Sequence, residues 1–159
     1  FAFPGKKPTD SSQHSGSERM GQGYAGDVTP KTAWDILKTK DDSYLVDCRT
    51  TAEWNFVGVP DLSQLNKEAA LLEWIRFPDG SPNPDFVNQV EQTIPDRDAT
   101  ILFLCRSGQR SIGAAAATTE AGYPNCYNVL EGFEGNANCE NHRNKSDGWK
   151  FAGLPWQQS

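Results

Sequence analysis

The chain has 159 residues, and its 15 Lys or Arg against 21 Asp or Glu give a formal net charge of −6 at pH 7. This length fits one domain with a sizeable core, and an acidic chain without a basic stripe gives no reason to expect a nucleic-acid partner. No run approaches the roughly 20 apolar residues that a membrane span needs, so we expect none.

The four cysteines, Cys48, Cys105, Cys126 and Cys139, are spaced neither as zinc ligands nor as a compact disulfide framework. This spacing favours a reduced, intracellular setting. The sequence contains no metal-ligand set and no cofactor fingerprint, so neither a metal site nor a cofactor is expected.

Residues 1–26 are rich in Gly, Ser, Pro and Lys and have only scattered apolar side chains. Such a segment buries too little apolar surface to offset the entropy lost on ordering it, so we predict an extended N-terminal arm. The arm is expected to lie on the domain surface or on another subunit, which makes it a candidate for protein assembly. Residues 27–159 are predicted to form one domain with a polar insertion around 136–148.

Helix and strand signals alternate along this domain. Thr29 and Pro30 are typical of the start of a helix, and apolar residues follow them at helical spacing. The apolar run at 44–48 predicts a buried strand. Thr50 and Glu53 then have the spacing of a capping box, which predicts a short helix.

The second half of the chain continues the alternation. Apolar residues after Pro84 share one helical face, and the run at 100–105 is almost wholly apolar, as expected for a central parallel strand covered on both sides. A helix from about Gln109 is predicted to stop at Gly122, and a further strand begins at Cys126. Strands separated by helices predict an α/β fold with a parallel sheet.

The sequence CRSGQRS follows the strongest predicted strand and begins with Cys105. In an open α/β sheet, the carboxyl ends of the strands form the edge where ligands bind. Gly108 allows a positive φ, and successive N–H groups together with the start of the next helix can hold an anion. Two nearby arginines favour the thiolate. We therefore interpret Cys105 as a nucleophile; the alternative is a buried core thiol, a common state of free cysteine.

These motifs resemble the single-domain rhodanese (sulfurtransferase) family over roughly residues 27–156. The resemblance rests on CRSGQRS with the Ala-rich helix after it, on YLVDCRTTAEW before it and on YNVLEGFEG beyond it. It implies a rhodanese-like α/β fold, with a central, mostly parallel five-stranded sheet flanked by helices on both faces.

The resemblance also implies roles for individual residues. Cys105 would take a sulfane sulfur as a persulfide from thiosulfate, a small anion, or from a persulfide donor, and would pass it to a thiophilic acceptor such as cyanide, a thiol or a protein. The substrate-binding loop would comprise Arg106, Ser107, Gly108, Gln109, Arg110 and Ser111, with Arg110 attracting anionic donors. The supporting residues would be Asp47, Arg49 and Glu53, which we interpret as charge pairing close to the loop.

Some motifs depart from the family pattern. Many relatives have Gly-His-Ile-Pro where this chain has VGVP, so no histidine role carries over, and relatives lack the long insertion. The sequences VGVPDLS, NPDF and EGFEG look closest to an alphaproteobacterial type, the group from which mitochondria descend. Because the sequence also begins at Phe1 rather than Met, we expect a processed mitochondrial protein, with the bacterial cytoplasm as the alternative.

Two other functions stay open. A cysteine phosphatase or arsenate reductase would also attack from a thiolate, but phosphatases place an arginine after five intervening residues, where this chain has Ser111. The shorter loop favours sulfur transfer. The other alternative is a catalytically idle rhodanese-fold subunit that serves as a structural component of a larger, mitochondrial complex. The arm and the insertion would be its docking elements.

Overall fold

The computed structural model describes residues 23–76, 80–137, 139–143, 145 and 147–158. Residues 1–22 of the expected arm therefore lie outside the described residues. The last residues that we assigned to the arm pack against the domain. Tyr24 is buried in the core, and the Ala25 N–H donates a hydrogen bond of 2.8 Å to the Cys126 carbonyl.

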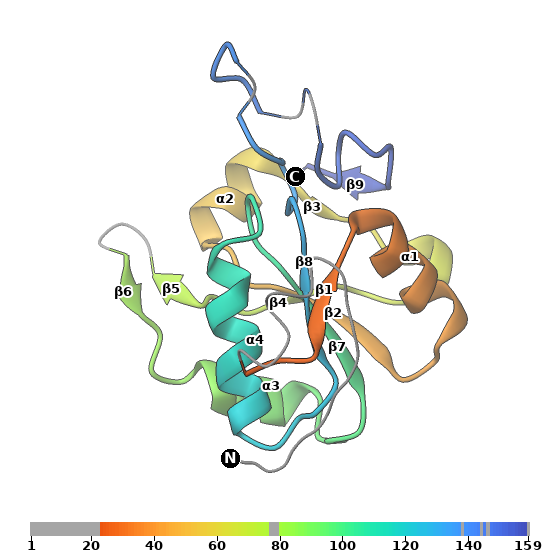
Figure 1. The fold of residues 1–159 in the computed structure, drawn as a ribbon, viewed down its shortest axis with the longest axis vertical. Helices are drawn as coiled ribbons and strands as arrows, with labels where there is room; N and C mark the ends of the chain where they lie inside the picture. The colour runs from red at the N-terminus through yellow and green to blue at the C-terminus, as the bar shows by residue number, and fades with distance from the viewer. Residues whose placement is uncertain (1–22, 77–79, 138, 144, 146, 159) are drawn as a thin grey trace.

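A five-stranded parallel sheet forms the centre of the domain (Figure 1), as the family resemblance implied. The strands are β1 (Gly26–Val28), β2 (Ser43–Asp47), β4 (Ala70–Leu71), β7 (Thr100–Leu104) and β8 (Cys126–Val129). Their order is β1-β8-β7-β2-β4, and each neighbouring pair is parallel. All residues of the central strand β7 are buried, because helices cover it on both sides.

Helices pack on both faces of the sheet and confirm the expected fold class. The helices are α1 (Pro30–Thr39), α2 (Thr51–Val57), α3 (Phe86–Thr93) and α4 (Arg110–Glu120). α1 shares one core with Leu45 and Leu102, whereas α3 and α4 share the opposite core with Val46 and Phe103. Alternate residues of β2 and β7 enter different cores because successive side chains of a strand point to opposite faces.

Local sequence signals set the helix ends as predicted. Thr29 Oγ1 accepts a hydrogen bond of 3.2 Å from the Thr32 N–H at the start of α1. At the start of α2, the Glu53 N–H donates to Thr50 Oγ1 at 3.3 Å and the Thr50 N–H donates to Glu53 Oε1 at 3.1 Å, which is the predicted capping box. Gly122, just past α4, has a φ of +112°.

Two pairs of two-residue strands were not predicted from the sequence. They are β3 (Val59–Pro60) with β9 (Trp156–Gln157), and β5 (Ile75–Arg76) with β6 (Ser81–Pro82), both antiparallel. A 3-10 turn, η2 (Ser63–Leu65), lies between β3 and β4. The pairing of β3 with β9 brings the C-terminal segment beside the end of α2, and the β5–β6 pair lies on the α4 side of the domain (Figure 1).

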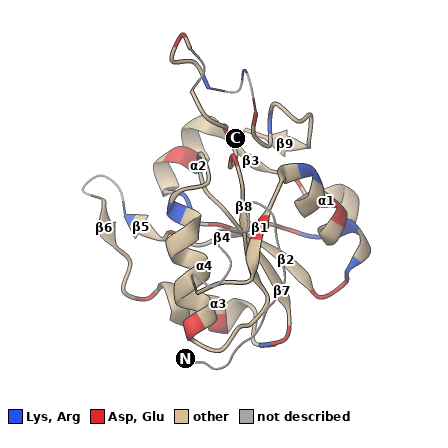
Figure 2. Cartoon of the chain, in the orientation of Figure 1, with Lys and Arg blue, Asp and Glu red and all other residues tan. Residues whose placement is uncertain are grey.

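The predicted insertion at 136–148 is closed at its base. The Asp147 carboxylate accepts hydrogen bonds of 2.7 Å from the Asn136 N–H and of 3.0 Å from Asn136 Nδ2. The described residues between these two positions lie away from the sheet, at the top of Figure 1. Figure 2 shows acidic and basic residues interspersed along the helices and loops. Among the described residues, no helix has the length and apolar character that crossing a membrane requires.

Candidate active site

The candidate site lies at the carboxyl edge of the parallel sheet. Cys105 directly follows β7, and the loop 105–109 leads into α4. On the neighbouring strand, β2 ends at Asp47 and α2 starts shortly after it. Because β2 and β7 are parallel and adjacent, both connections reach the same edge, which is where ligands bind in sheets of this kind. The structure thus brings the predicted loop beside the start of α2.

Cys105 is 1 % exposed and is held by groups of its own loop. The Gly108 N–H donates to Cys105 Sγ at 3.1 Å, and Ser111 Oγ lies 3.2 Å from the same sulfur. The Ser111 hydroxyl also donates to Asn128 Oδ1. Since this hydroxyl has one proton, it can donate to Asn128 while Cys105 is a thiol and can turn towards Sγ when Cys105 is a thiolate.

Asn128 is a site residue that the sequence analysis missed. It is fully buried in β8, and its Nδ2 donates to the Gly108 carbonyl at 3.3 Å and to Asp27 Oδ1 at 3.0 Å. The side chain therefore holds the loop to the neighbouring strand. The signal was present, because an amide inside the apolar run CYNVL needs polar partners once it is buried.

The sequence EGFEG braces the loop through its backbone. The Phe133 N–H donates to the Cys105 carbonyl at 2.8 Å, and the Glu134 N–H donates to the Arg106 carbonyl at 3.0 Å. Gly132 has a φ of +65°, and a Cβ at this position would lie 2.5 Å from the carbonyl carbon of Arg106. Glycine is therefore required by both its conformation and the close approach of the loop.

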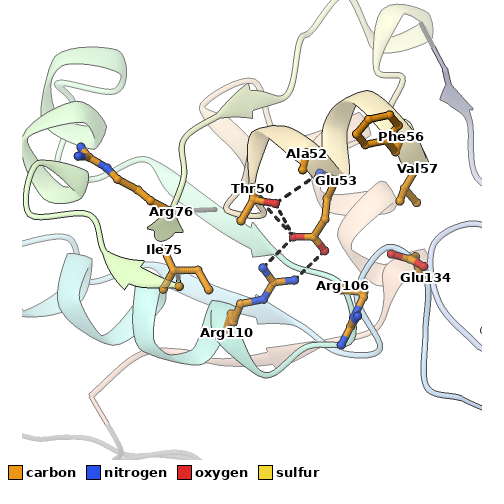
Figure 3. Close-up of a pocket in the computed structure, with 11 residues that line it drawn as sticks. Thr50, Ala52, Glu53, Phe56, Val57, Ile75, Arg76, Arg106, Arg110 and Glu134 are labelled. Atoms are coloured by element: carbon orange, nitrogen blue, oxygen red, sulfur yellow. Dashed lines mark hydrogen bonds and ion pairs between the residues drawn. The ribbon is translucent and has the colours of Figure 1, made fainter. Parts of the chain in front are cut away.

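Arg110 does not face the pocket as an unpaired cation. Its Nη1 and Nη2 donate to the two carboxylate oxygens of Glu53, each at 2.8 Å (Figure 3). Burial on its own would raise the pKa of Glu53, but the hydrogen bonds and charge of Arg110 outweigh it and lower this pKa from 4.5 to about 2. An anionic donor would have to share Arg110 with Glu53. The pair joins α2 to α4, two helices that are far apart in the sequence.

Asp47 and Arg49 form a second, separate ion pair rather than a trio with Glu53. Both side chains are fully buried, with Arg49 Nε 2.8 Å from Asp47 Oδ1 and Nη2 2.6 Å from Oδ2. Arg49 Nη2 also donates to the Gly58 carbonyl at 2.7 Å, and the guanidinium lies 4.2 Å from the centre of the Phe133 ring. This pair connects the end of β2, the end of α2 and the EGFEG segment, so its place is consistent with a supporting role.

A pocket of about 610 Å³ opens beside the loop (Figure 3). Its lining combines a rim of apolar and small residues with three arginines and two glutamates: Thr50, Ala52, Glu53, Phe56, Val57, Ile75, Arg76, Gly80, Arg106, Arg110 and Glu134. Phe56 on this rim is 79 % exposed. Of the loop residues, Arg106 and Arg110 line the pocket, whereas Cys105 is buried and is not among the lining residues. Ser107 is half-buried and Gln109 is exposed. An anion in the pocket therefore meets the guanidinium groups of residues adjacent to Cys105 in the loop.

Comparisons with known proteins agree with this fold. A family model described as the STR4 middle domain matches residues 25–159. An uncharacterised Rickettsia conorii protein is 44 % identical over 126 residues, which cover 79 % of this chain and 91 % of that protein. The chain belongs to the rhodanese family.

Other rhodanese relatives are more distant or differ in architecture. The chain is 26 % identical over 132 residues to the chloroplastic rhodanese-like domain-containing protein 4 of Arabidopsis thaliana, covering 82 % of this chain and 25 % of that protein. It is 25 % identical over 131 residues to the thiosulfate sulfurtransferase GlpE of Actinobacillus succinogenes, covering 82 % of this chain and 89 % of that protein.

A solved structure gives a strong structural match to this rhodanese. The crystal structure of Rv0390 from M. tuberculosis superposes with a TM-score of 0.79 at 49 % sequence identity, covering 86 % of this chain and 99 % of that chain. At this level of identity the likeness extends beyond the fold to the sequence. The comparisons confirm the predicted family membership, and the Rickettsia relatives are consistent with the predicted alphaproteobacterial type.

Proposed function

We propose that this rhodanese is a sulfurtransferase that carries a sulfane sulfur on Cys105. The observation that carries the proposal is the placement of Cys105 Sγ at the end of the central strand, where it accepts the Gly108 N–H next to a pocket lined by Arg106 and Arg110. The distant relative named as a thiosulfate sulfurtransferase supports the same chemistry.

The reaction has two displacement steps. The Cys105 thiolate attacks the outer sulfur of thiosulfate, the S–S bond of thiosulfate breaks, and sulfite leaves with the bonding electrons. The product is a persulfide on Cys105. A thiophilic acceptor then attacks the terminal sulfur and restores the thiolate; cyanide leaves as thiocyanate, and a thiol acceptor leaves as a new persulfide.

The loop supports the negative charge at both stages. The Gly108 N–H and the start of α4 provide positive partial charge at Sγ, and the Ser111 hydroxyl can add a second donor. Arg106 is exposed at the pocket and attracts the anionic donor, whereas the charge of Arg110 is largely offset by Glu53. The apolar rim suits an acceptor with an apolar portion.

The phosphatase alternative is disfavoured by the position of Ser111. A phosphatase loop would have an arginine there, whereas the Ser111 side chain is buried and turned towards Cys105 and Asn128. The predictions of a protein partner at the N-terminal arm and of a mitochondrial setting stay predictions from the sequence. The Rickettsia relatives are bacterial proteins.

The proposal is tested by assaying the full chain with thiosulfate and cyanide and measuring thiocyanate. The wild type and Cys139→Ser, which alters an exposed cysteine, should both produce thiocyanate, and Cys105→Ser should not. A phosphate ester should not be hydrolysed by any of them. Phosphate release that is lost in Cys105→Ser, with no thiocyanate from the wild type, would reverse the assignment.

A further inference from the structure

Cys48 lies directly beside Cys105 in the sheet. β2 and β7 pair in parallel up to Asp47 opposite Leu104, and the Cys48 N–H continues the ladder by donating to the Leu104 carbonyl at 2.8 Å. The next two residues in register are Cys48 and Cys105. Neighbouring strands lie about 4.8 Å apart, which is within the range of Cα separations that a disulfide bridges, about 4.4 to 6.8 Å.

The two sulfur atoms point to the same face of the sheet. Cys48 and Cys105 belong to one core cluster together with Val46 and Phe103, the residues two positions earlier on each strand. The thiol of Cys48 donates to the Leu104 carbonyl at 3.3 Å, so its side chain leans towards β7. The other two cysteines are placed differently, because Cys126 lies in β8 opposite Ile101 and Cys139 lies in the insertion.

The hydrogen-bond partners of Cys105 Sγ are linked to β8 rather than to β2, which carries Cys48. β7 lies between β2 and β8. Gly108 and Ser111, which contact Cys105 Sγ, are both tied to Asn128 of β8, so these donors lie on the β8 side. Cys48 lies on the β2 side. A group bonded to Sγ and held by the donors would therefore leave on the side opposite to Cys48, as an in-line displacement requires.

The pKa of Cys48 responds to burial and to the charge on its neighbour. The pKa of Cys48 is raised well above its ordinary value by burial and, next in size, by the negative charge of Cys105. When Cys105 becomes a neutral sulfenic acid, the second of these causes disappears. The reactivity of Cys48 is thus coupled to the chemical state of Cys105.

We propose that Cys48 is a resolving thiol, which displaces a leaving group from Cys105 Sγ and closes a Cys48–Cys105 disulfide. With a peroxide as oxidant, Cys105 first becomes a sulfenic acid; Cys48 sulfur then attacks Cys105 Sγ, the S–O bond breaks, and the Cys48 proton leaves with the hydroxide as water. With a persulfide on Cys105, the same attack breaks the S–S bond to the terminal sulfur and releases hydrosulfide. A thiol reductant reduces the Cys48–Cys105 disulfide by thiol–disulfide exchange, whichever route formed it.

The second branch rests on the proposed function, whereas the peroxide branch does not. In the peroxide branch, the disulfide protects Cys105 from oxidation to the irreversible sulfinic acid. In the persulfide branch, Cys48 turns a sulfur carrier without an acceptor into a source of hydrosulfide. Both branches form the same Cys48–Cys105 disulfide, so detection of this disulfide tests the role of Cys48 in either branch.

Tryptic cleavage isolates the two cysteines on separate peptides. Cys48 lies in DDSYLVDCR, residues 41–49, and Cys105 lies in DATILFLCR, residues 98–106. The reduced full chain is treated with hydrogen peroxide, digested without reductant and analysed by mass spectrometry. We expect the two peptides to be linked, with the loss of two hydrogens, and the link to disappear on treatment with a dithiol. Cys48→Ala should lose the link and should accumulate Cys105 sulfinic acid.

Matched variants keep the result interpretable. Cys126→Ala also removes a buried strand cysteine from the same core and should retain the link between peptides 41–49 and 98–106. In a second arm, thiosulfate is added without acceptor, and the wild type should release hydrosulfide that Cys48→Ala does not. Sulfinic acid on Cys105 of the wild type with no link to Cys48, or a link to Cys139 instead, would overturn the proposal. Failure of thiosulfate to load Cys105 would contradict the proposed function while the peroxide arm still decides the role of Cys48.

Discussion

The ion pair between Glu53 and Arg110 should make the stability of the domain depend on pH. The substitution Glu53→Gln removes the negative charge that faces Arg110. It keeps the capping box of α2, because Gln serves in the same position as Glu. α2 should therefore still form, while its connection to α4 weakens and Arg110 loses its partner.

The size of the effect follows from the pKa of Glu53. The fall from 4.5 to about 2 corresponds to about 3 kcal/mol at ~1.4 kcal/mol per pKa unit. The side chains of Glu53 and Arg110 are 18 % and 25 % exposed, so solvent screening reduces the expected contribution to about 1 to 2 kcal/mol. Because the pKa of the folded state is depressed, this stabilisation is present above the unfolded value of 4.5 and is lost as the pH falls towards 2.

The assay is urea unfolding of wild type and Glu53→Gln at several pH values. The free energy of unfolding of the wild type should exceed that of the variant by about 1 to 2 kcal/mol near neutral pH, and the gap should narrow below about pH 4. Glu91→Gln is the matched control, because Glu91 pairs with Arg97 on the surface and its loss should change stability by less than about 0.5 kcal/mol. A gap that stays constant down to about pH 3 would refute this account of the pair.

Three further substitutions test the supports of the loop. Asp47→Asn should destabilise the domain by about 3 to 5 kcal/mol in urea unfolding, because it leaves the charge of buried Arg49 uncompensated; a change below about 1 kcal/mol would contradict the role of the pair. Gly132→Ala should lower both stability, by about 1 to 3 kcal/mol, and sulfur transfer, since its Cβ would press on the loop backbone; unchanged activity would show that the loop adapts. Arg106→Gln should raise the KM for thiosulfate more than it lowers kcat, and the KM of the wild type should rise with salt concentration. A KM that changes neither with the substitution nor with salt would exclude electrostatic attraction of thiosulfate by Arg106.

The elements that depend on local pattern were predictable from the sequence. The apolar run ending at Cys105 predicted β7, the spacing of Thr50 and Glu53 predicted the capping box of α2, and Gly122 predicted the end of α4. The edge that carries the loop followed from the alternation of strands and helices. These features are set by residues a few positions apart, which is the range over which periodicity and capping operate.

The features that depend on distant residues were not predictable in the same way. The partner of Glu53 is Arg110, 57 positions away, and nothing local to either residue indicates this pairing. The strands β3, β5, β6 and β9 have two residues each, too few for any periodic pattern. The contact of the EGFEG segment with the loop arises only when β7 and β8 lie side by side. From the sequence, EGFEG could be recognised as a family motif, but its contact with the loop could not be predicted.

The most direct test of the central claim is the mass of the intact chain after thiosulfate treatment and removal of small molecules. Sulfur transfer through Cys105 predicts the addition of one sulfur atom, located on the peptide of residues 98–106, removed by cyanide and absent in Cys105→Ser. Cys48 could displace the added sulfur from Cys105 before the mass is measured. The measurement is therefore made at short times and repeated with Cys48→Ala. An unchanged mass in both proteins with no hydrosulfide released, or a sulfur atom found on Cys139 instead, would contradict the account.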